Sequence, residues 1–215
     1  MSKTIQLVIK KLLDYVFSLV GTVLLIPVFI VVAIAIKLGS PGPVFFKQTR
    51  VGLDGREFPA YKFRSMVQNA EDINLKERIT EDKYGVIQDD PRITRVGNFL
   101  RKTSLDELPQ ILNILRGEMS FIGPRPDIVP QAKCYTTWER RRLEMKPGIS
   151  GWAQVNGRNR LSWPEKFKLD IWYADHYSLG LDLRILLKTL KVIFEADGIY
   201  TEGEDQLNVK RNPRL

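Results

Sequence analysis

The stretch YVFSLVGTVLLIPVFIVVAIAI, residues 15–36, contains no charged side chain. As one α-helix it would be roughly 33 Å long, which is enough to cross the hydrocarbon core of a bilayer. A helix on the surface of a soluble core should show a polar face, and this stretch shows none. It is also too long for the apolar part of a cleaved signal peptide, and Lys37 follows it directly. The stretch therefore predicts a membrane helix.

The flanks of this helix leave two topologies open. Pro27 lies near its middle, where it removes a backbone hydrogen bond and forces a kink. Basic residues, which favour the cytoplasmic side, occur on both flanks: Lys3, Lys10 and Lys11 before the stretch, and Lys37, Lys47 and Arg50 after it. We expect residues 1–37 to form a helix broken at Pro27, either re-entrant with both ends on one side or a single kinked span.

Composition restricts both the partners and the metal chemistry. Lys and Arg number 33 against 25 Asp and Glu, which gives a formal net charge of +8. This excess indicates an anionic partner, such as nucleic acid, a phosphorylated small molecule or an acidic membrane surface. Cys134 and His176 are the single cysteine and histidine, so an intramolecular disulfide and cysteine- or multi-histidine metal sites are excluded. Any metal would need oxygen ligands, which favours Mg²⁺.

The remaining chain predicts an α+β, mostly helical fold. Two runs rich in Val, Phe and Tyr flank Asp54-Gly55 within residues 43–66, a pattern typical of a β-hairpin. Helical patterns follow at residues 163–178 and 182–196.

We divide the chain into three parts on this basis. Residues 1–37 are the membrane helix, and residues 38–200 form one compact, mostly helical domain that carries the hairpin and lies on the membrane surface. Within this domain residues 68–83 are charged and form either an exposed helix or a mobile loop. Residues 201–215 form a polar tail.

The stretch TSLDELPQILNILRG, residues 103–117, places two acids at the expected start of a helix. Ser104 and Glu107 have the spacing of a capping box, in which each side chain accepts a backbone N–H of the first turn. Leucines then recur at helical spacing, and Gly117 ends the pattern. On this stretch alone we interpret Asp106 and Glu107 as helix-capping acids rather than chemical groups.

Several ordered blocks of the sequence resemble one known family. They are SPGPVFFKQTRVG, YKFRSM, the run from RKTSLDELPQ to FIGPRP, KPGISGWAQVNGRN and the region around LDIWY and LDL. From about Leu12 to Ile199 the chain is similar to the bacterial sugar transferases, the monotopic polyprenyl-phosphate phosphoglycosyl transferases. One departure is Ile26-Pro27, where the family often carries Ser-Pro at the helix break.

The resemblance implies an enzyme of the cytoplasmic face of the bacterial inner membrane. Such enzymes transfer a sugar-1-phosphate from a UDP-sugar to polyprenyl (undecaprenyl) phosphate with Mg²⁺, release UMP and start a lipid-linked glycan. By the family pattern Asp106 is the nucleophile and Glu107 helps to hold the metal. A carboxylate nucleophile would divide the transfer into two displacements through an acyl phosphate.

The resemblance also indicates candidate substrate contacts, each of which has an alternative interpretation as an ordinary structural or surface residue. Lys62, Arg64, Arg101 and Arg125 become candidates to bind phosphate or nucleotide, although each basic residue taken alone is more often a solvated surface charge. Asp182 matches a family acid that supports the site, and it could equally be the N-cap of the last long helix.

Two functions of other classes remain as alternatives. One is a membrane-anchored, basic nucleic-acid-binding protein, which lacks a recognised binding motif in this sequence and leaves the Asp-Glu pair unexplained. The other is a magnesium-dependent phosphohydrolase. The preferred interpretation has a UDP-sugar, polyprenyl phosphate and membrane lipid as partners and no nucleic acid, and it is compatible with a homodimer.

Overall fold

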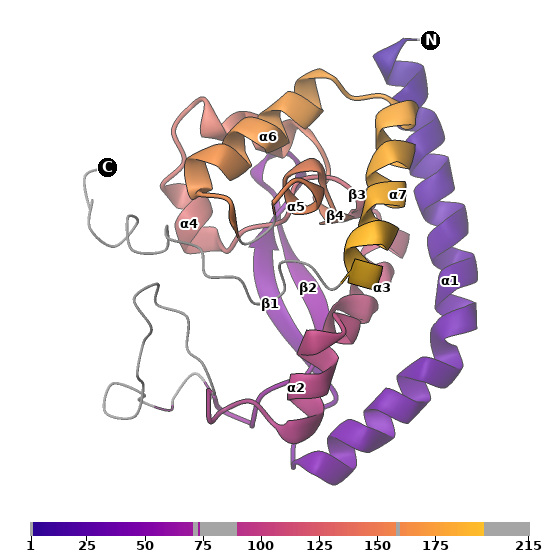
Figure 1. The fold of residues 1–215 in the computed structure, drawn as a ribbon, viewed down its shortest axis with the longest axis vertical. Helices are drawn as coiled ribbons and strands as arrows, with labels where there is room; N and C mark the ends of the chain where they lie inside the picture. The colour runs from indigo at the N-terminus through magenta and orange to yellow at the C-terminus, as the bar shows by residue number, and fades with distance from the viewer. Residues whose placement is uncertain (1, 71–72, 74–89, 158–159, 196–215) are drawn as a thin grey trace.

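The computed structural model describes residues 2–70, 73, 90–157 and 160–195 (Figure 1). The predicted polar tail and most of the segment 68–83 lie outside these residues. Within them the fold is mostly helical, as the sequence predicts, and it has two small sheets, of which the sequence predicts only the hairpin.

The helix α1, Lys3–Gly39, runs along one side of the molecule and bends part-way (Figure 1). Pro27 lies inside α1 and supplies the usual cause of such a bend. By length and composition α1 is apolar enough to cross a membrane, and 11% of the residues in its most apolar stretch of 18 are buried. A core helix of a soluble protein would be buried there, so this helix fits a membrane-associated segment.

Both halves of α1 pack against the rest of the chain. In the first half Lys10, Asp14 and Ser18 are buried at intervals of four residues, which places them on one face. In the second half Val32 and Ile36 join the cluster that includes Phe63 and Leu100. The opposite face of α1 exposes large apolar residues, with Leu12, Val23 and Leu24 exposed by 60% or more. The helix is therefore attached to the body on one face and apolar on the other.

The predicted β-hairpin is confirmed. β1, Phe45–Val51, pairs antiparallel with β2, Glu57–Phe63, with Phe45 opposite Phe63. The connecting turn uses Asp54 at φ 55° and Gly55 at φ 79°. These left-handed conformations suit Asp and Gly, which explains why this dipeptide indicated the turn.

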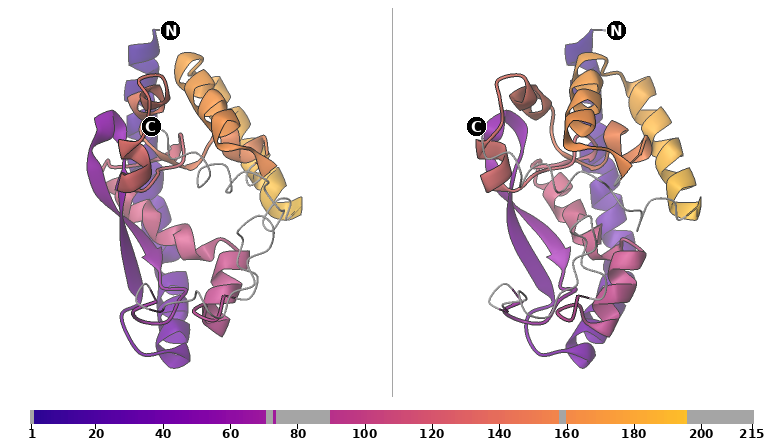
Figure 2. Two further views of the ribbon diagram at one scale, coloured as in Figure 1. Left: turned by 90° about the vertical axis from the view of Figure 1, so that its left-hand side faces the viewer. Right: turned by 60° about the vertical axis from the view of Figure 1, so that its left-hand side comes forward.

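The helices α6, Trp163–Asp175, and α7, Leu179–Glu195, lie on the opposite side of the body from the hairpin, as Figure 2 shows. Both helices were predicted and are confirmed, and buried Tyr173 and Ile185 pack them against Ile122 of β3. The short strands β3 and β4 pair in parallel. The bounds are α2 Arg95–Lys102, α3 Ile111–Leu115, β3 Ser120–Ile122, α4 Val129–Lys133, β4 Gly148–Ser150, α5 Trp152–Val155, α6 Trp163–Asp175 and α7 Leu179–Glu195, with 3₁₀ turns at Leu53–Gly55, Leu105–Gln110 and Glu139–Glu144.

Candidate active site

The Asp106-Glu107 pair lies on a 3₁₀ turn, Leu105–Gln110, and not at the start of an α-helix. The predicted capping box is wrong, because Ser104 has the left-handed φ of 57° and its side chain makes no capping bond. Pro109 inside the segment has no N–H to donate, which disfavours a continuous α-helix across it. The α-helical part, α3, starts only at Ile111, and the predicted stop at Gly117 is confirmed by its φ of 78°. The two acids are therefore not explained by capping.

Two cations from other elements hold the Glu107 carboxylate. Lys62 of β2 donates to Oε1 at 2.7 Å, and Arg125 donates through Nη2 to Oε1 at 2.7 Å and through Nη1 to Oε2 at 3.3 Å. Burial opposes ionisation of Glu107, but Arg125 and Lys62 outweigh it and hold the pKa of this carboxyl well below its usual range. Glu107 is therefore a permanent anion at neutral pH and fixes two basic side chains beside Asp106.

Asp106 is in a different state from its neighbour. Its carboxylate accepts no hydrogen bond and forms no ion pair within the described residues, while its side chain is only partly exposed. Burial and the adjacent Glu107 charge raise the pKa of Asp106, and the charges of Lys62, Arg101 and Arg125 oppose this shift. An unpaired carboxylate with a raised pKa among cations is suited to attack an anionic, electrophilic centre.

The other predicted contacts divide between this site and places elsewhere. Arg101 lies in the last turn of α2 and is exposed, and its positive charge acts on Asp106 without a hydrogen bond in the described part of the chain. Arg64 is buried and donates from Nη2 to the Ser40 carbonyl at 2.8 Å and from Nη1 to the Pro41 carbonyl, so its guanidinium closes the end of α1. The structure thus brings Lys62, Arg101 and Arg125 together and keeps Arg64 out of this cluster.

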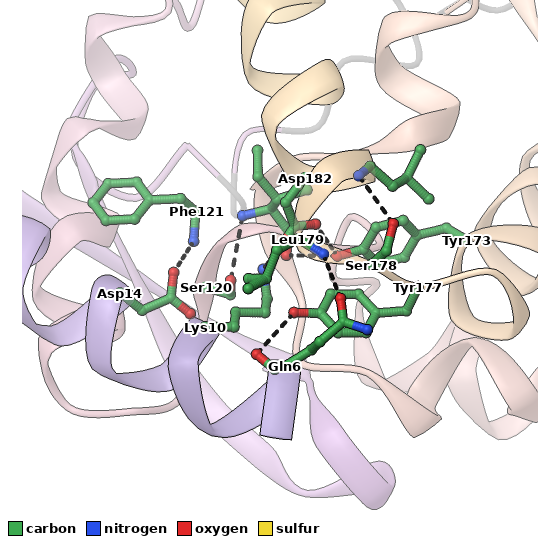
Figure 3. Close-up of polar contacts among 12 residues, drawn as sticks. Gln6, Lys10, Asp14, Ser120, Phe121, Tyr173, Tyr177, Ser178, Leu179 and Asp182 are labelled. Carbon is green, nitrogen blue, oxygen red and sulfur yellow. Dashed lines mark hydrogen bonds and ion pairs between the residues drawn. The ribbon is translucent and has the colours of Figure 1, made fainter. Parts of the chain in front are cut away.

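Asp182 lies in a separate polar cluster that attaches α1 to the body (Figure 3). It accepts from Lys10 Nζ and from the Tyr173 hydroxyl, both at 2.6 Å. The N-cap interpretation is wrong, because α7 begins three residues earlier and the amide of Leu181 donates to Ser178 Oγ at 3.1 Å. A contact of Asp182 with substrate stays a prediction.

One cation of the site was missed by the sequence reasoning. Arg50 of β1 donates to the Pro126 carbonyl at 3.0 Å and to Gln48 Oε1 at 2.5 Å. Burial and the Arg125 charge lower the pKa of Arg50, while Asp127 and Glu107 oppose this change. Its place in the block FFKQTRVG was a signal that could have found it.

The carboxylates of this turn are suited to a magnesium ion that takes most of its ligands from substrate phosphates and water. The described residues contain no group of three or more His, Cys, Asp or Glu side chains that could hold a metal. From the described part of the chain Glu107 Oε2 accepts the 3.3 Å bond from Arg125 alone and Asp106 accepts none, so both retain lone pairs for a cation. Mg²⁺ is commonly bound by one or two carboxylates together with substrate phosphates and water.

The sequence matches one known protein family over most of its length. The model of the family described as "Bacterial sugar transferase" matches residues 5–196. The chain belongs to this family.

Curated members of the bacterial sugar transferase family align over most of the chain. "Uncharacterized sugar transferase EpsL" of Bacillus subtilis (strain 168) is 43% identical over 196 residues, which are 90% of this chain and 91% of that protein. "Undecaprenyl-phosphate galactose phosphotransferase" of Salmonella typhimurium is 40% identical over 89% of this chain. "UDP-glucose:undecaprenyl-phosphate glucose-1-phosphate transferase" of Escherichia coli (strain K12) is 42% identical over 85% of it. The chain spans 42% and 39% of the lengths of the latter two proteins.

Proposed function

We propose that this protein transfers a sugar-1-phosphate from a UDP-sugar to a polyprenyl phosphate and releases UMP. The names of the Salmonella and Escherichia relatives describe this class of reaction for those proteins. The observation that carries the proposal is the pair of adjacent acids in two different states. Glu107 is neutralised by Lys62 and Arg125, whereas Asp106, beside the same cations, forms no ion pair with any residue that the structure describes.

In the first step an Asp106 carboxylate oxygen attacks the phosphorus that carries the sugar. The bond between this phosphorus and the bridging oxygen breaks, and UMP leaves with that oxygen. The product is an acyl phosphate between Asp106 and the sugar-1-phosphate, so no proton has to be transferred. Lys62, Arg101 and Arg125 lower the cost of bringing a carboxylate against a diphosphate, because phosphoryl transfer depends mainly on positioning and charge neutralisation.

In the second step an oxygen of polyprenyl phosphate attacks the same phosphorus. The bond to Asp106 breaks, the carboxylate is restored, and the product is a polyprenyl diphosphate sugar. Both steps use one site in turn, so the kinetics should be ping-pong. The raised pKa of Asp106 makes it a better nucleophile than an ordinary carboxylate, and the Glu107 charge beside it helps to keep this value raised.

Magnesium belongs to the proposal as a group that this chain would share with the substrate. Glu107 and Asp106 would hold it together with the diphosphate, and it would add positive charge where negative charge develops. Arg125 and Lys62 orient the Glu107 carboxylate through their hydrogen bonds. The metal would bind to the lone pairs that these bonds leave free.

For the topology we propose a re-entrant α1, with the body on the cytoplasmic face of the bacterial inner membrane. Contacts at both ends of α1 support this form. Lys3 Nζ donates to the Ala174 carbonyl at 2.8 Å near the start, and Arg64 binds Ser40 just after the end. Attachment of both ends to one body favours an arrangement in which both ends lie on the same side of the membrane, and the exposed apolar face would then meet lipid.

The test is the release of UMP from purified protein in detergent. A panel of UDP-sugars, including glucose, galactose and N-acetylated hexosamine donors, is supplied with undecaprenyl phosphate and Mg²⁺. Without acceptor, a donor labelled in the sugar should leave label on the denatured wild-type protein and none on Asp106→Asn. Asp175→Asn serves as the matched control, because Asp175 is an exposed acid paired with Arg141.

The outcomes separate the competing functions. Activity of Asp106→Asn within a few-fold of wild type would refute covalent catalysis by this residue. Continuous UMP release without acceptor would identify a phosphohydrolase. No turnover with any donor, together with salt-dependent binding of nucleic acid, would favour the binding protein.

A further inference from the structure

The turn of residues 124–127, which carries Arg125, is attached through every one of its main-chain carbonyls. Four consecutive carbonyl oxygens accept hydrogen bonds from other parts of the chain. The pairs are Gly148 N to Pro124 O at 2.9 Å, Arg142 Nη2 to Arg125 O at 2.8 Å, Arg50 Nη1 to Pro126 O at 3.0 Å and Val51 N to Asp127 O at 3.0 Å. A turn without helix or strand structure is thus placed by its surroundings rather than by its own conformation.

The donor to the Arg125 carbonyl is itself held in one position. Arg142 is 3% exposed, and its Nη2 also binds Asp170 Oδ2 at 2.6 Å. Its Nη1 binds the Asp127 carboxylate and the Tyr135 hydroxyl, the latter at 2.7 Å. The planar guanidinium fork can satisfy these partners together only in one orientation, which fixes the direction in which it meets the Arg125 carbonyl.

Stability alone does not explain this buried group of charges. Burying a guanidinium with two carboxylates has a large desolvation cost, and apolar residues of similar volume often do as well. Buried ionic groups can instead specify one geometry, and here that geometry includes the turn carrying Arg125. The base of this turn is also tightly packed, because a Cβ on Gly123 would lie 2.1 Å from the Lys146 carbonyl oxygen.

We infer that Arg142 is a positioning residue for the proposed transfer, which acts by holding the main chain of Arg125 so that the Arg125 guanidinium spans both oxygens of Glu107. The guanidinium of Arg142 binds Asp127, Tyr135, Asp170 and the Arg125 carbonyl, so it reaches the two acids of the site through Arg125. The inference rests on the proposed function for its effect on rate. Its structural part, the control of the turn by Arg142, does not.

The test is a double-mutant cycle between Arg142→Lys and Arg125→Ala. Lysine keeps the charge for Asp127 and Asp170 but lacks the fork that reaches the Arg125 carbonyl. A misplaced charge-stabilising group commonly costs up to about 100-fold, so we expect Arg142→Lys to lower kcat/KM by about 10- to 100-fold. In the Arg125→Ala background, where no guanidinium remains to be positioned, the further loss should be less than about 3-fold.

Arg141→Lys is the matched control. Arg141 is the preceding residue and pairs with Asp175 and Glu144 at the surface, so its substitution should change kcat/KM by less than about 2-fold. An equal loss from Arg142→Lys in both backgrounds would overturn the inference, because a general structural defect acts independently of Arg125. Equal losses in Arg141→Lys and Arg142→Lys would do the same.

Hydrogen exchange separates this inference from the proposed function, because it needs no substrate. In Arg142→Lys the amides of Gly148 and Val51, which donate to the turn, should exchange faster, while those within α7, which holds none of the partners of Arg142 named above, should not change. Unchanged exchange at both amides would refute control of the turn, whether or not the wild type transfers sugar. If Arg142→Lys does not fold, Asp170→Asn takes its place in both experiments with the same expected signature, and an additive loss or unchanged exchange would overturn the inference.

Discussion

The attachment of α1 to the body can be tested through the Lys10–Asp182 ion pair. The pair is 2.6 Å long, and its side chains are only 9% and 13% exposed. The other Asp182 oxygen accepts from Tyr173, whose side chain is fully buried. Asp182→Leu would leave the Lys10 ammonium without this partner. It would also remove the acceptor of the short hydrogen bond from the Tyr173 hydroxyl. Removal of one partner of a buried pair costs about 3–5 kcal/mol, and we expect a loss of this size in the free energy of unfolding.

The reverse substitution should cost less. In Lys10→Met the Asp182 carboxyl keeps its bond to Tyr173. Burial already raises the pKa of Asp182 and Lys10 opposes this shift, so Asp182 without Lys10 can take up a proton instead of remaining a buried anion. We expect a loss of about 1–3 kcal/mol. The double variant Lys10→Met with Asp182→Leu replaces the pair by apolar groups and should recover to within about 2 kcal/mol of wild type.

The assay is denaturant unfolding in detergent micelles, followed by tryptophan fluorescence. Asp175→Leu provides the control, because this exposed acid should contribute less than about 1 kcal/mol. The reasoning is refuted if Asp182→Leu remains within about 1 kcal/mol of wild type, or if the double variant is less stable than either single variant. Loss of transfer in Asp182→Asn at unchanged stability would instead place Asp182 in the active site.

Three further predictions concern the site and the membrane. Lys62→Met should lower kcat/KM by about 10- to 100-fold, because it removes one of the cations that neutralise the Glu107 carboxylate. Unchanged kinetics would show that Lys62 has only a structural role. Because burial and Glu107 raise the pKa of Asp106, the acid limb of kcat/KM should lie above the pH expected for an ordinary aspartate. It should move higher still in Lys62→Met, since Lys62 favours the Asp106 anion, and an acid limb that stays in place or moves lower in that variant would contradict this assignment. In a Cys134→Ser background, a cysteine at Ser2 should react with an impermeant reagent only after cells are permeabilised, while labelling in intact cells would establish a single span.

Local patterns determined much of the fold. The apolar stretch of residues 15–36 predicted the long helix, and Asp54-Gly55 predicted the hairpin turn because few residues adopt left-handed backbone conformations easily. The helices α6 and α7 followed from their own periodicity. Each of these features depends on residues close together in the chain, so the sequence contains the necessary information.

Local patterns gave wrong predictions where the same spacing or residue type is compatible with more than one structure. The Ser104–Glu107 spacing matched a capping box, but the left-handed backbone of Ser104 and the proline at 109 produce a 3₁₀ turn whose acids do not cap a helix. Asp182 is a residue type that often occupies the N-cap position. In the structure Ser178 caps α7, and Asp182 binds Lys10. Spacing alone does not state which partner a polar side chain meets.

By itself the sequence determined the family, the membrane helix and the two acids as candidates, because these depend on residue identity and short-range order. Only the tertiary structure decided which basic side chains lie beside the two acids. Lys62 and Arg125 lie 45 and 18 residues from Glu107 and reach it because β2 and the turn at 124–127 pack beside the 3₁₀ turn, whereas Arg64 of the same hairpin region turns to the end of α1. Such partners depend on how distant elements pack and which groups they leave unsatisfied, and periodicity within one element carries no information on that packing.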